Sequence, residues 1–411
     1  MKSSLTFKEG FHKCFYAFCR AVITPYFYLF KHYRWKVYKP ASRNYLVLTN
    51  HNTNYDFFLF GLSFRKHMYY VASEAILRAG FGGKCVKALA DPIPRKKGAS
   101  GRDASKMIVE RLRKGFNVCM MVEGNRSFSG ETGWISDANG PLVKESGAGL
   151  ITYLVHGAYF VNPRWSHKQR SGRMWGEVVH EYTPEEIAQM TPEEVTEIIR
   201  RDIYLNAYDD QQKFNYKYRN DALAEHLETA LFMCPDCKKA STLRSKGNRF
   251  YCTDCGMDLE FNEYGYFRSN TEKASPFKTI IDWSKWETGY LKEYLKQFDS
   301  LDGKCGGRPD ELIFSDEGIS LYEVKADKSS ELLVKGEIAL YPDRLVFRKP
   351  GQPCDTEYVY GIKEIRYMSI FVADRIMFTA GDKYYETRSD KPFSALKYLI
   401  SWRFLDGKEY L

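Results

Sequence analysis

The sequence predicts an α/β domain built on a mostly parallel sheet with helical cover, followed by a small cysteine-containing module and a small antiparallel β-barrel. Two observations support this fold class. Between about residues 44 and 165, short apolar runs alternate with amphipathic segments, which is typical of strands and helices that form a parallel sheet. From about residue 311 onward, strand-like runs are separated by turns until a last apolar helix over residues 392–405.

The chain length and the placement of charge limit the possible functions. The 411 residues are enough for two or three domains. The net charge of +9 is concentrated in residues 1–44, which contain nine Lys or Arg residues and one acid, Glu9. This distribution favours contact with anionic lipids over nucleic acid, whose binding domains carry basic charge on a folded surface. No uncharged apolar run reaches the ~20 residues that span a bilayer, so we expect a cytoplasmic protein, peripheral on the membrane.

The first 39 residues form a basic, aromatic leader. We expect an amphipathic helix from about Phe7 to Thr24, ending before Pro25 because the residue before a proline disfavours helical geometry. Two interpretations remain open: the helix packs on the protein's own core, or it lies in the plane of the membrane. Its apolar side chains recur at helical spacing at Phe11, Cys14, Phe15, Phe18 and Val22.

The next segment, residues 40–230, contains the predicted parallel sheet. We expect buried strands at YLVLT, MYYVAS, VKALA, NVCMMVEG and AYFVNP, and helices at DFFLFGLSFR, SGRDASKMIVERLRKG and VKESGAGLITYLVHG. Two further helices begin at the repeated TPEE sequences, where Thr caps the helix, Pro occupies its first position and Glu follows in the first turn. The repeat is therefore a helix start without a functional role.

The sequence TNHNTNYDFF, residues 49–58, follows the predicted strand YLVLT directly and has two interpretations. In the first, Thr53 and Asp56 form a capping box for the next helix, which gives no role to Asn50 or His51. In the second, the chain folds back so that the Asp56 carboxylate holds one nitrogen of the His51 imidazole and leaves the other as a general base. The location suits the second interpretation, because ligands of parallel sheets bind beyond the carboxyl ends of the strands.

Two further loops contain residues suited to a phosphate group. VEGNRS follows a predicted strand; Gly124 allows close approach of the backbone, and Arg126 offers a planar guanidinium. DPIPRKK places Arg95 on the loop after another strand. Each loop taken alone is more often an ordinary solvated turn, so the evidence lies in their combination.

Taken together, these motifs resemble the glycerol-phosphate and lysophosphatidate (1-acylglycerol-3-phosphate) acyltransferase family. The family signature is Asn-His, four residues and Asp, followed later by Glu-Gly-x-Arg-Ser, with an arginine between them. The resemblance covers about residues 40–180, with Thr53 at the position of the usual serine and FVNPRW in place of the usual Val-Pro. The matching residues are Asn50, His51, Asp56, Arg95, Glu123, Gly124, Arg126 and Ser127.

The resemblance implies the acyltransferase fold and transfer of a fatty acyl group from acyl-CoA or acyl-carrier protein to the hydroxyl of a lysophosphatidate or lysophospholipid acceptor, in phospholipid biosynthesis. It implies that His51 removes the hydroxyl proton, that Asp56 orients the imidazole, and that no acyl-enzyme forms. Glu123 would orient Arg126 or an acceptor hydroxyl, while the arginines hold the phosphate. The implied substrate-binding residues are Asn50, Arg95, Glu123, Gly124, Arg126 and Ser127.

Four cysteines between residues 231 and 270 have the spacing of a zinc ribbon. Two Cys-x-x-Cys pairs are separated by fourteen residues, and each pair can present two thiolates to one metal ion; a redox role for one pair is the alternative. The sequence between the pairs predicts a hairpin that turns at SKGN. Four thiolates leave the metal no open position, so we expect structural Zn²⁺. The ligands are Cys234, Cys237, Cys252 and Cys255.

The remaining segments are a linker helix within residues 271–309 and a β-rich domain over residues 310–411. The strand rhythm and closing helix of this domain resemble GRAM and pleckstrin-homology-like barrels, which bind lipid headgroups or proteins; a plain packing role fits as well. Two alternatives to the phospholipid function remain. One is an acyltransferase whose acceptor carries no phosphate, and the other is a non-catalytic zinc-ribbon adaptor or nucleic-acid-binding protein.

Overall fold

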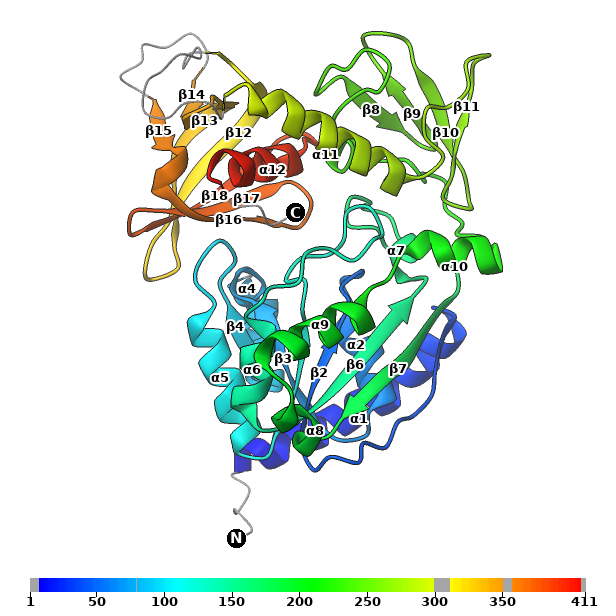
Figure 1. Cartoon of the computed structure of the whole chain (residues 1–411), viewed down its shortest axis with the longest axis vertical. Coiled ribbons are helices and arrows are strands. Elements are labelled where there is room, and N and C mark those ends of the chain that lie inside the picture. Colours follow the sequence, from blue (N-terminus) through cyan, green and yellow to red (C-terminus); the bar gives the residue numbers. More distant parts are fainter. Residues whose placement is uncertain (1–6, 79, 299–310, 350–356, 408–411) are drawn as a thin grey trace. The chain divides into compact units, whose positions relative to one another are not determined.

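The computed structural model describes residues 7–78, 80–298, 311–349 and 357–407 (Figure 1). The first six residues of the predicted leader, the end of the predicted linker (residues 299–309) and residue 310 of the predicted β-rich domain lie outside this range. The chain divides into two compact units. The first consists of Met1–Lys96, Gly101–Arg164 and Gln169–Asn220, and the second of Lys97–Ser100, Trp165–Lys168 and Asp221–Leu411.

The first unit is built on a seven-stranded sheet. Its strands are β1 (Tyr33–Trp35), β2 (Tyr45–Thr49), β3 (Met68–Ser73), β4 (Ile93–Arg95), β5 (Asn117–Met121), β6 (Gly149–His156) and β7 (Met174–Tyr182). The strand order is β1-β7-β6-β2-β5-β3-β4, and β6 with β7 is the one antiparallel pair in this sheet. The prediction of a mostly parallel α/β sheet is confirmed.

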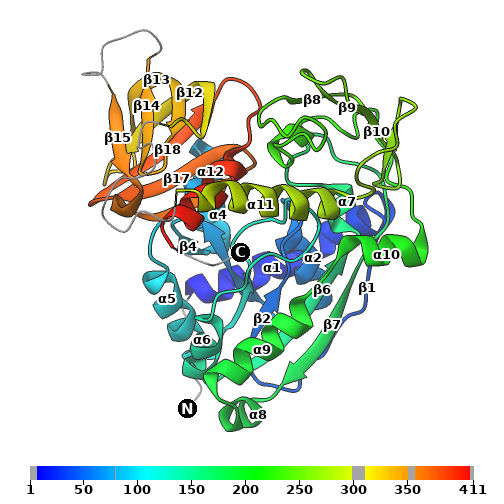
Figure 2. The ribbon, with the colours of Figure 1, turned by 45° about the horizontal axis from the view of Figure 1, so that its top comes forward.

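Helices cover both faces of this sheet. They are α1 (Phe7–Leu29), α2 (Asp56–Ser63), α3 (Glu74–Leu77), α4 (Gly80–Ala90), α5 (Arg102–Arg113), α6 (Asn139–Ser146), α7 (Ala158–Val161), α8 (Pro184–Gln189), α9 (Pro192–Ile203) and α10 (Ala207–Phe214). α1 and α2 lie on one face, and α5, α6 and α9 on the other (Figures 1 and 2). The central strand β2 is buried on both faces: Leu46 and Leu48 pack with α5, α6 and α9, while Tyr45 and Val47 alternate to the opposite face.

Three segments differ from the predicted secondary structure. VKALA, predicted as a strand, is the second half of α4, and AYFVNP, also predicted as a strand, contains α7. VKESGAGLITYLVHG, predicted as one helix, is the end of α6 followed by β6. Gly147 ends α6 with a φ of 63°, which glycine adopts readily. These short apolar runs carry no periodicity that separates a helix from a strand.

The long first helix also differs from its prediction. α1 continues through Pro25 to Leu29, so the expected end before Pro25 is wrong. Pro25 is exposed, as is Ala21, whose carbonyl has no helical N–H partner at Pro25 because proline carries no N–H. Buried Phe27 contacts the rings of Tyr55 and Phe58, with centroids 5.7 and 6.1 Å apart, and this packing stabilises the last turn. The TPEE helix starts, by contrast, are confirmed as capping boxes.

The second unit contains two antiparallel sheets. The smaller sheet consists of β8 (Leu243–Lys246), β9 (Arg249–Cys252), β10 (Asp258–Phe261) and β11 (Phe267–Ser269), and the long helix α11 (Ile280–Lys296) follows it. The hairpin predicted at SKGN is confirmed, since β8 and β9 pair across Gly247, whose φ is 61°. A short 3₁₀ helix, Leu227–Thr229, precedes the cysteines.

The larger sheet has seven antiparallel strands in the order β15-β14-β13-β12-β18-β17-β16. Helix α12 (Ala395–Leu405) packs on it next to α11 (Figure 1). The predicted antiparallel strands and closing helix are therefore present. The strands are β12 (Phe314–Val324), β13 (Ser330–Leu340), β14 (Arg344–Arg348), β15 (Tyr358–Gly361), β16 (Ile365–Phe371), β17 (Arg375–Ala380) and β18 (Lys383–Ser389), with a 3₁₀ helix at Ile362–Glu364.

A buried ion pair connects the cysteine-containing module to the larger sheet within the second unit. Lys397 of α12 is 1% exposed, and its Nζ lies 2.6 Å from Asp316 Oδ2 of β12. The same ammonium donates to the hydroxyl of Ser241, beside the ribbon strands. A buried charge of this kind is stable only while its partners stay in place, so the module and the larger sheet stabilise each other.

Candidate active site

The turn between β2 and α2 brings His51 and Asp56 together. His51 Nδ1 lies 2.8 Å from Asp56 Oδ2. Asp56 is the first residue of α2 and is 1% exposed, whereas the His51 side chain is 22% exposed. The chain thus folds back at the carboxyl end of β2, which buries the carboxylate and presents the imidazole to solvent.

The turn supplies further donors to the Asp56 carboxylate. It accepts hydrogen bonds from Asn52 N at 2.7 Å, from Thr53 N at 3.0 Å and from the Thr53 hydroxyl. The carboxylate oxygens are thus the acceptors in every one of these hydrogen bonds. His51 Nδ1 therefore donates to Asp56, and Nε2 carries the lone pair that makes it the basic atom of the ring.

The capping-box interpretation of Thr53 and Asp56 is met in part: Asp56 accepts from Thr53 N at 3.0 Å and the Thr53 hydroxyl oxygen accepts from Tyr55 N at 3.3 Å, but the helix itself begins later, at Asp56. The N-cap of α2 is Tyr55, and no side chain caps the helix there. The Thr53 hydroxyl donates to Asp56, and the Asp56 carboxylate points back to the turn that precedes it. Both residues therefore hold the histidine turn as well as the entry to α2.

The loop after β5 holds the backbone of His51. Glu123 Oε1 accepts from His51 N at 2.9 Å, and Glu123 Oε2 accepts from Gly133 N at 2.7 Å. Ser127 N donates to His51 O at 3.1 Å. Burial raises the pKa of Glu123 to about 7. The two predicted motifs are therefore joined through the main chain of the histidine.

The guanidinium of Arg126 is bonded to the protein itself. Its Nε donates to Asn52 O at 3.0 Å, and its Nη1 donates to Asn54 Oδ1 at 2.6 Å. Its Nη2 donates to the carbonyl of Asn162 and, at 3.2 Å, to the side-chain oxygen of the same residue. Burial lowers the pKa of Arg126 to about 10. Arg126 thus ties the histidine turn to the segment after α7.

Asn162 and Arg164 complete this network and were not among the predicted site residues. Asn162 is 3% exposed, and its Oδ1 also accepts from Asn54 N at 3.3 Å. Arg164 is 4% exposed and donates from Nη1 to Arg126 O at 2.9 Å. Both lie in FVNPRW, the segment at the position of the family's Val-Pro. Two polar side chains in an otherwise apolar buried run were the signal that could have identified them.

The other predicted residues have different surroundings. Asn50 is 2% exposed, and its side-chain amide bonds to both N and O of Val155, at 3.0 and 2.9 Å, so it joins β2 to β6. The Ser127 hydroxyl donates to a backbone carbonyl of its own loop at 2.7 Å. Gly124 has a φ of 64°, which favours glycine. Arg95 ends β4 at the same edge of the sheet, separated from β2 by β5 and β3.

The four predicted cysteine ligands gather in the second unit. Their sulfur atoms all lie within 4.8 Å of one another. Cys234 Sγ is 3.6 Å from Cys255 Sγ, and Cys237 Sγ is 3.8 Å from Cys252 Sγ. A tetrahedral ion with bonds of about 2.3 Å to sulfur has sulfur–sulfur edges of about 3.8 Å. The cluster therefore fits a single metal ion.

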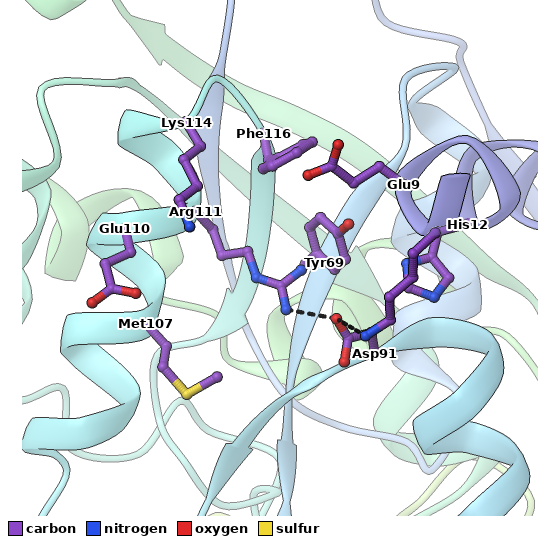
Figure 3. Close-up of a pocket in the computed structure, with 10 residues that line it drawn as sticks. Glu9, His12, Tyr69, Asp91, Met107, Glu110, Arg111, Lys114 and Phe116 are labelled. Atoms are coloured by element: carbon purple, nitrogen blue, oxygen red, sulfur yellow. Dashed lines mark hydrogen bonds and ion pairs between the residues drawn. The ribbon is translucent and has the colours of Figure 1, made fainter. Parts of the chain in front are cut away.

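A separate pocket of about 300 Å³ lies at the opposite edge of the main sheet, beside the amino end of β3 (Figure 3). In it, Asp91 pairs with Arg111 at 2.8 Å and with Lys8 at 3.2 Å, and the Arg111 guanidinium stands 3.8 Å from the centre of the Tyr69 ring. These charges neutralise one another within the pocket. We assign it to the packing of α1 against the sheet and not to the candidate active site.

Comparison with known proteins relates the region that contains His51 to a known family. Residues 32–152 match the family model described as Acyltransferase. This range contains both predicted motifs, so the acyltransferase resemblance is confirmed for an acyltransferase-type domain in the first unit. A search of curated proteins gives no match.

Solved structures with similarity to parts of the chain include an enzyme and a small domain. The 1-acyl-sn-glycerophosphate (LPA) acyltransferase PlsC from Thermotoga maritima is 20% identical, over 49% of this chain and 80% of its own, with a TM-score of 0.38. The Vps36 N-terminal PH domain is 17% identical, over 24% of this chain and 80% of its own, with a TM-score of 0.20.

Proposed function

We propose that the acyltransferase-type domain transfers a fatty acyl group from the thioester of acyl-CoA or acyl-carrier protein to the hydroxyl of a lysophosphatidate or lysophospholipid acceptor. The observation that carries this proposal is the His51–Asp56 pair, 2.8 Å apart at the carboxyl end of β2 within the matched region. A partly exposed imidazole oriented by a buried carboxylate is the arrangement of a general base.

The proposed reaction needs one base and no covalent intermediate on the protein. His51 Nε2 takes the proton of the acceptor hydroxyl while the oxygen attacks the thioester carbonyl. The new C–O bond forms, the C–S bond breaks, and the departing thiolate receives the proton from the imidazolium. Asp56, whose carboxylate is fixed by the turn, stabilises the positive ring during the step.

Acceptor binding is proposed for Arg95, Glu123, Gly124, Arg126 and Ser127, with Asn50 supporting the strand ends. Four of the five N–H groups of the Arg126 guanidinium have acceptors within the described chain. Direct contact of Arg126 with a phosphate would therefore use its remaining Nη1–H. Arg95, at the same edge of the sheet, is the second cation proposed for the phosphate.

The bonding of Arg126 also supports a second candidate function. An arginine that donates four N–H groups to its own loops holds those loops together. This role would be sufficient for an enzyme whose acceptor carries no phosphate. The two candidates differ in their acceptors, and mass spectrometry of products formed from mixed lysolipids and neutral lipid alcohols separates them.

Association with a membrane surface is proposed for α1. Among the described residues, no helix has both the length and the hydropathy to cross a bilayer. α1 instead exposes apolar side chains along its length and carries cations beside them, which suits a helix lying on an anionic surface. The exposed apolar residues are Phe7, Phe11, Phe18, Val22, Tyr26, Tyr28 and Leu29.

Structural Zn²⁺ is the ion proposed for the cysteine cluster.

The test of the proposed function is the substitution His51→Ala in the full chain. We expect the rate of acyl transfer to fall by about 100- to 10,000-fold, because a positioned general base contributes that much. The unfolding temperature should stay near that of the unmodified protein, since the His51 ring is partly exposed. Lipid products from lysophosphatidate and acyl-CoA are measured by mass spectrometry.

The first unit provides a matched control in a second histidine–aspartate pair. His156 Nδ1 lies 2.8 Å from Asp210 Oδ2, the same separation as in the candidate site, but His156 is 8% exposed and stacks on Trp175. His156→Asn, which keeps a donor to Asp210, should retain turnover. Near-normal turnover by His51→Ala would overturn the assignment of His51 as the base.

A further inference from the structure

Helix α4 is almost uncovered by the rest of the first unit. Of its 11 residues, Gly83 alone is buried. Gly83 lies against α3 so closely that a Cβ atom there would be 2.7 Å from Ile76 O and 2.6 Å from Leu77 O. α3 and α4 therefore form a tight helical hairpin, and among the described residues most of α4 is exposed.

Several apolar residues of this hairpin are exposed. Phe81 is 82% exposed, Ile76 is 47% exposed and Val86 is 40% exposed. Among the described large apolar residues, only Phe7 of α1 is more exposed than Phe81. Leaving a phenyl ring in water forgoes most of the free energy that burying it would provide. Such a ring, on a helix of this length, indicates a surface that becomes covered.

A comparison with α5 shows what a core-packed helix in the same unit looks like. α5 buries Ala104, Ile108, Val109 and Leu112 and turns its charged residues outward. α4 has a different arrangement, since Phe81 and Val86 are exposed and its buried position is a glycine. Phe81 and Val86 are therefore not part of the protein's own core.

The charge around these apolar residues favours an anionic surface. Residues 74–90 contain three cations, Arg78, Lys84 and Lys87, against the single acid Glu74. An amphipathic helix that interleaves exposed apolar residues with cations binds at the boundary of headgroups and acyl chains, where the cations meet phosphates.

The position of the hairpin connects it to the candidate site. α3 begins directly after the carboxyl end of β3, and α4 leads into β4, whose last residue is Arg95. The end of α4 is also adjacent to α1, since His12 Nε2 lies 3.4 Å from Ala88 O. The hairpin thus belongs to the same face as α1 and to the connection that carries a proposed acceptor-binding arginine.

We propose that the α3–α4 hairpin is a second membrane-docking element, which inserts Phe81 into an anionic lipid bilayer while Lys84 and Lys87 bind its headgroups. The proposal deepens the proposed function, because it assigns a lipid surface to the loop that bears Arg95. It concerns binding and can be measured without turnover.

The experiment measures binding of the full chain to sedimenting vesicles of phosphatidylcholine with and without phosphatidylglycerol. Phe81→Asp should weaken binding to the mixed vesicles by at least about tenfold, as expected for removing a buried aromatic ring. The double variant Lys84→Gln/Lys87→Gln should weaken binding by about fivefold per charge on mixed vesicles at low salt and have little effect on pure phosphatidylcholine. Leu332→Asp is the matched control, because Leu332 is 51% exposed on the second unit, and it should bind as the unmodified protein does.

The outcomes test the docking element and the proposed acyl transfer separately. Equal binding by Phe81→Asp and the unmodified protein would overturn it, as would a loss of self-association caused by Phe81→Asp, which would assign the surface to a second copy of the chain. An unmodified protein that binds vesicles through Phe81 and transfers no acyl group would leave the docking element in place and remove the proposed function. A protein that transfers acyl groups but binds vesicles equally well with and without the Phe81 ring would keep the proposed function and refute the docking element.

Discussion

The histidine turn and the cysteine cluster are both short loops, yet they are stabilised in opposite ways. In the turn, Asp56 accepts hydrogen bonds from the preceding backbone, and Glu123 and Ser127 hold the main chain of His51. In the cluster, four sulfur atoms face one another within 4.8 Å. The turn satisfies its polar groups with donors of the chain itself, whereas the cluster gathers four ligands that could hold one metal ion between them.

Because the two loops are stabilised differently, substitutions in them should affect different properties, activity in one case and folding in the other. A turn stabilised by its own hydrogen bonds is organised before a substrate binds, so removal of its reactive side chain changes activity and leaves the fold. A cluster that depends on an ion loses structure when one ligand is lost. Variants in the two loops should therefore have different effects, one on turnover and the other on unfolding.

The largest expected effect is the loss of a cysteine ligand. Cys237→Ser should reduce bound zinc from one equivalent to near zero and destabilise the second unit, since structural zinc contributes on the order of 10 kcal/mol to small zinc-binding folds. The Lys397–Asp316 ion pair extends this effect to the larger sheet, because Ser241 beside the cluster shares the same ammonium. Metal analysis and calorimetric unfolding of the full chain measure both consequences.

Cys85→Ser is the matched control for the cysteine ligand. Cys85 lies on α4 in the first unit, is partly exposed and is far in sequence from the cluster. It should retain one equivalent of zinc and an unchanged unfolding profile. Full zinc content in Cys237→Ser would show that the cluster does not hold the ion.

The same contrast explains how much the sequence alone could predict. The cysteine ligands and the His51–Asp56 pair lie within short segments, so their spacing indicates the chemistry directly. Asn162 and Arg164 escaped prediction because their role depends on contacts with residues 36 or more positions away, which local patterns do not contain.

The prediction of secondary structure was wrong in places for a related reason. β6 is buried along its whole length, so its apolar run lacks the alternation that identifies a strand. α1 extends beyond Pro25 because Phe27 packs on the ring of Tyr55, a contact that comes from a different part of the chain. In these places tertiary packing overrides the local signals on which a sequence prediction depends.

A smaller effect is expected from Asn162, and it tests whether the turn is self-sufficient. Asn162 binds both Arg126 and the backbone of Asn54. Asn162→Leu removes the side-chain acceptor, and we expect kcat to fall by about 10- to 100-fold, because small misplacements of a catalytic group have effects of that size. Asn162→Asp keeps the oxygen acceptors and should restore most of the rate. Steady-state kinetics with the lysophospholipid acceptor measure both variants.

Two further variants separate positioning from general stability. Thr191→Ala removes the N-cap of α9 and should destabilise the protein by about 1 kcal/mol without changing kcat.

The double variant Asn162→Leu/Arg126→Ala should lose little more activity than Arg126→Ala alone, since the two side chains act as one unit. Additive losses would contradict a shared positioning role.

The last expected effect concerns Glu123 and the pH dependence of stability. Burial raises the pKa of Glu123 to about 7, above its value in the unfolded chain, so the folded protein binds the proton more tightly. The resulting stabilisation is present in full below the unfolded pKa and is lost as the pH rises through about 7. Glu123→Gln cannot titrate, so its stability should not show this decrease, which amounts to roughly 2 to 3 kcal/mol between pH 5 and pH 8. Unfolding temperatures of both proteins across this range measure the difference, and parallel curves would show that the carboxylate holding His51 N is already ionised at pH 5.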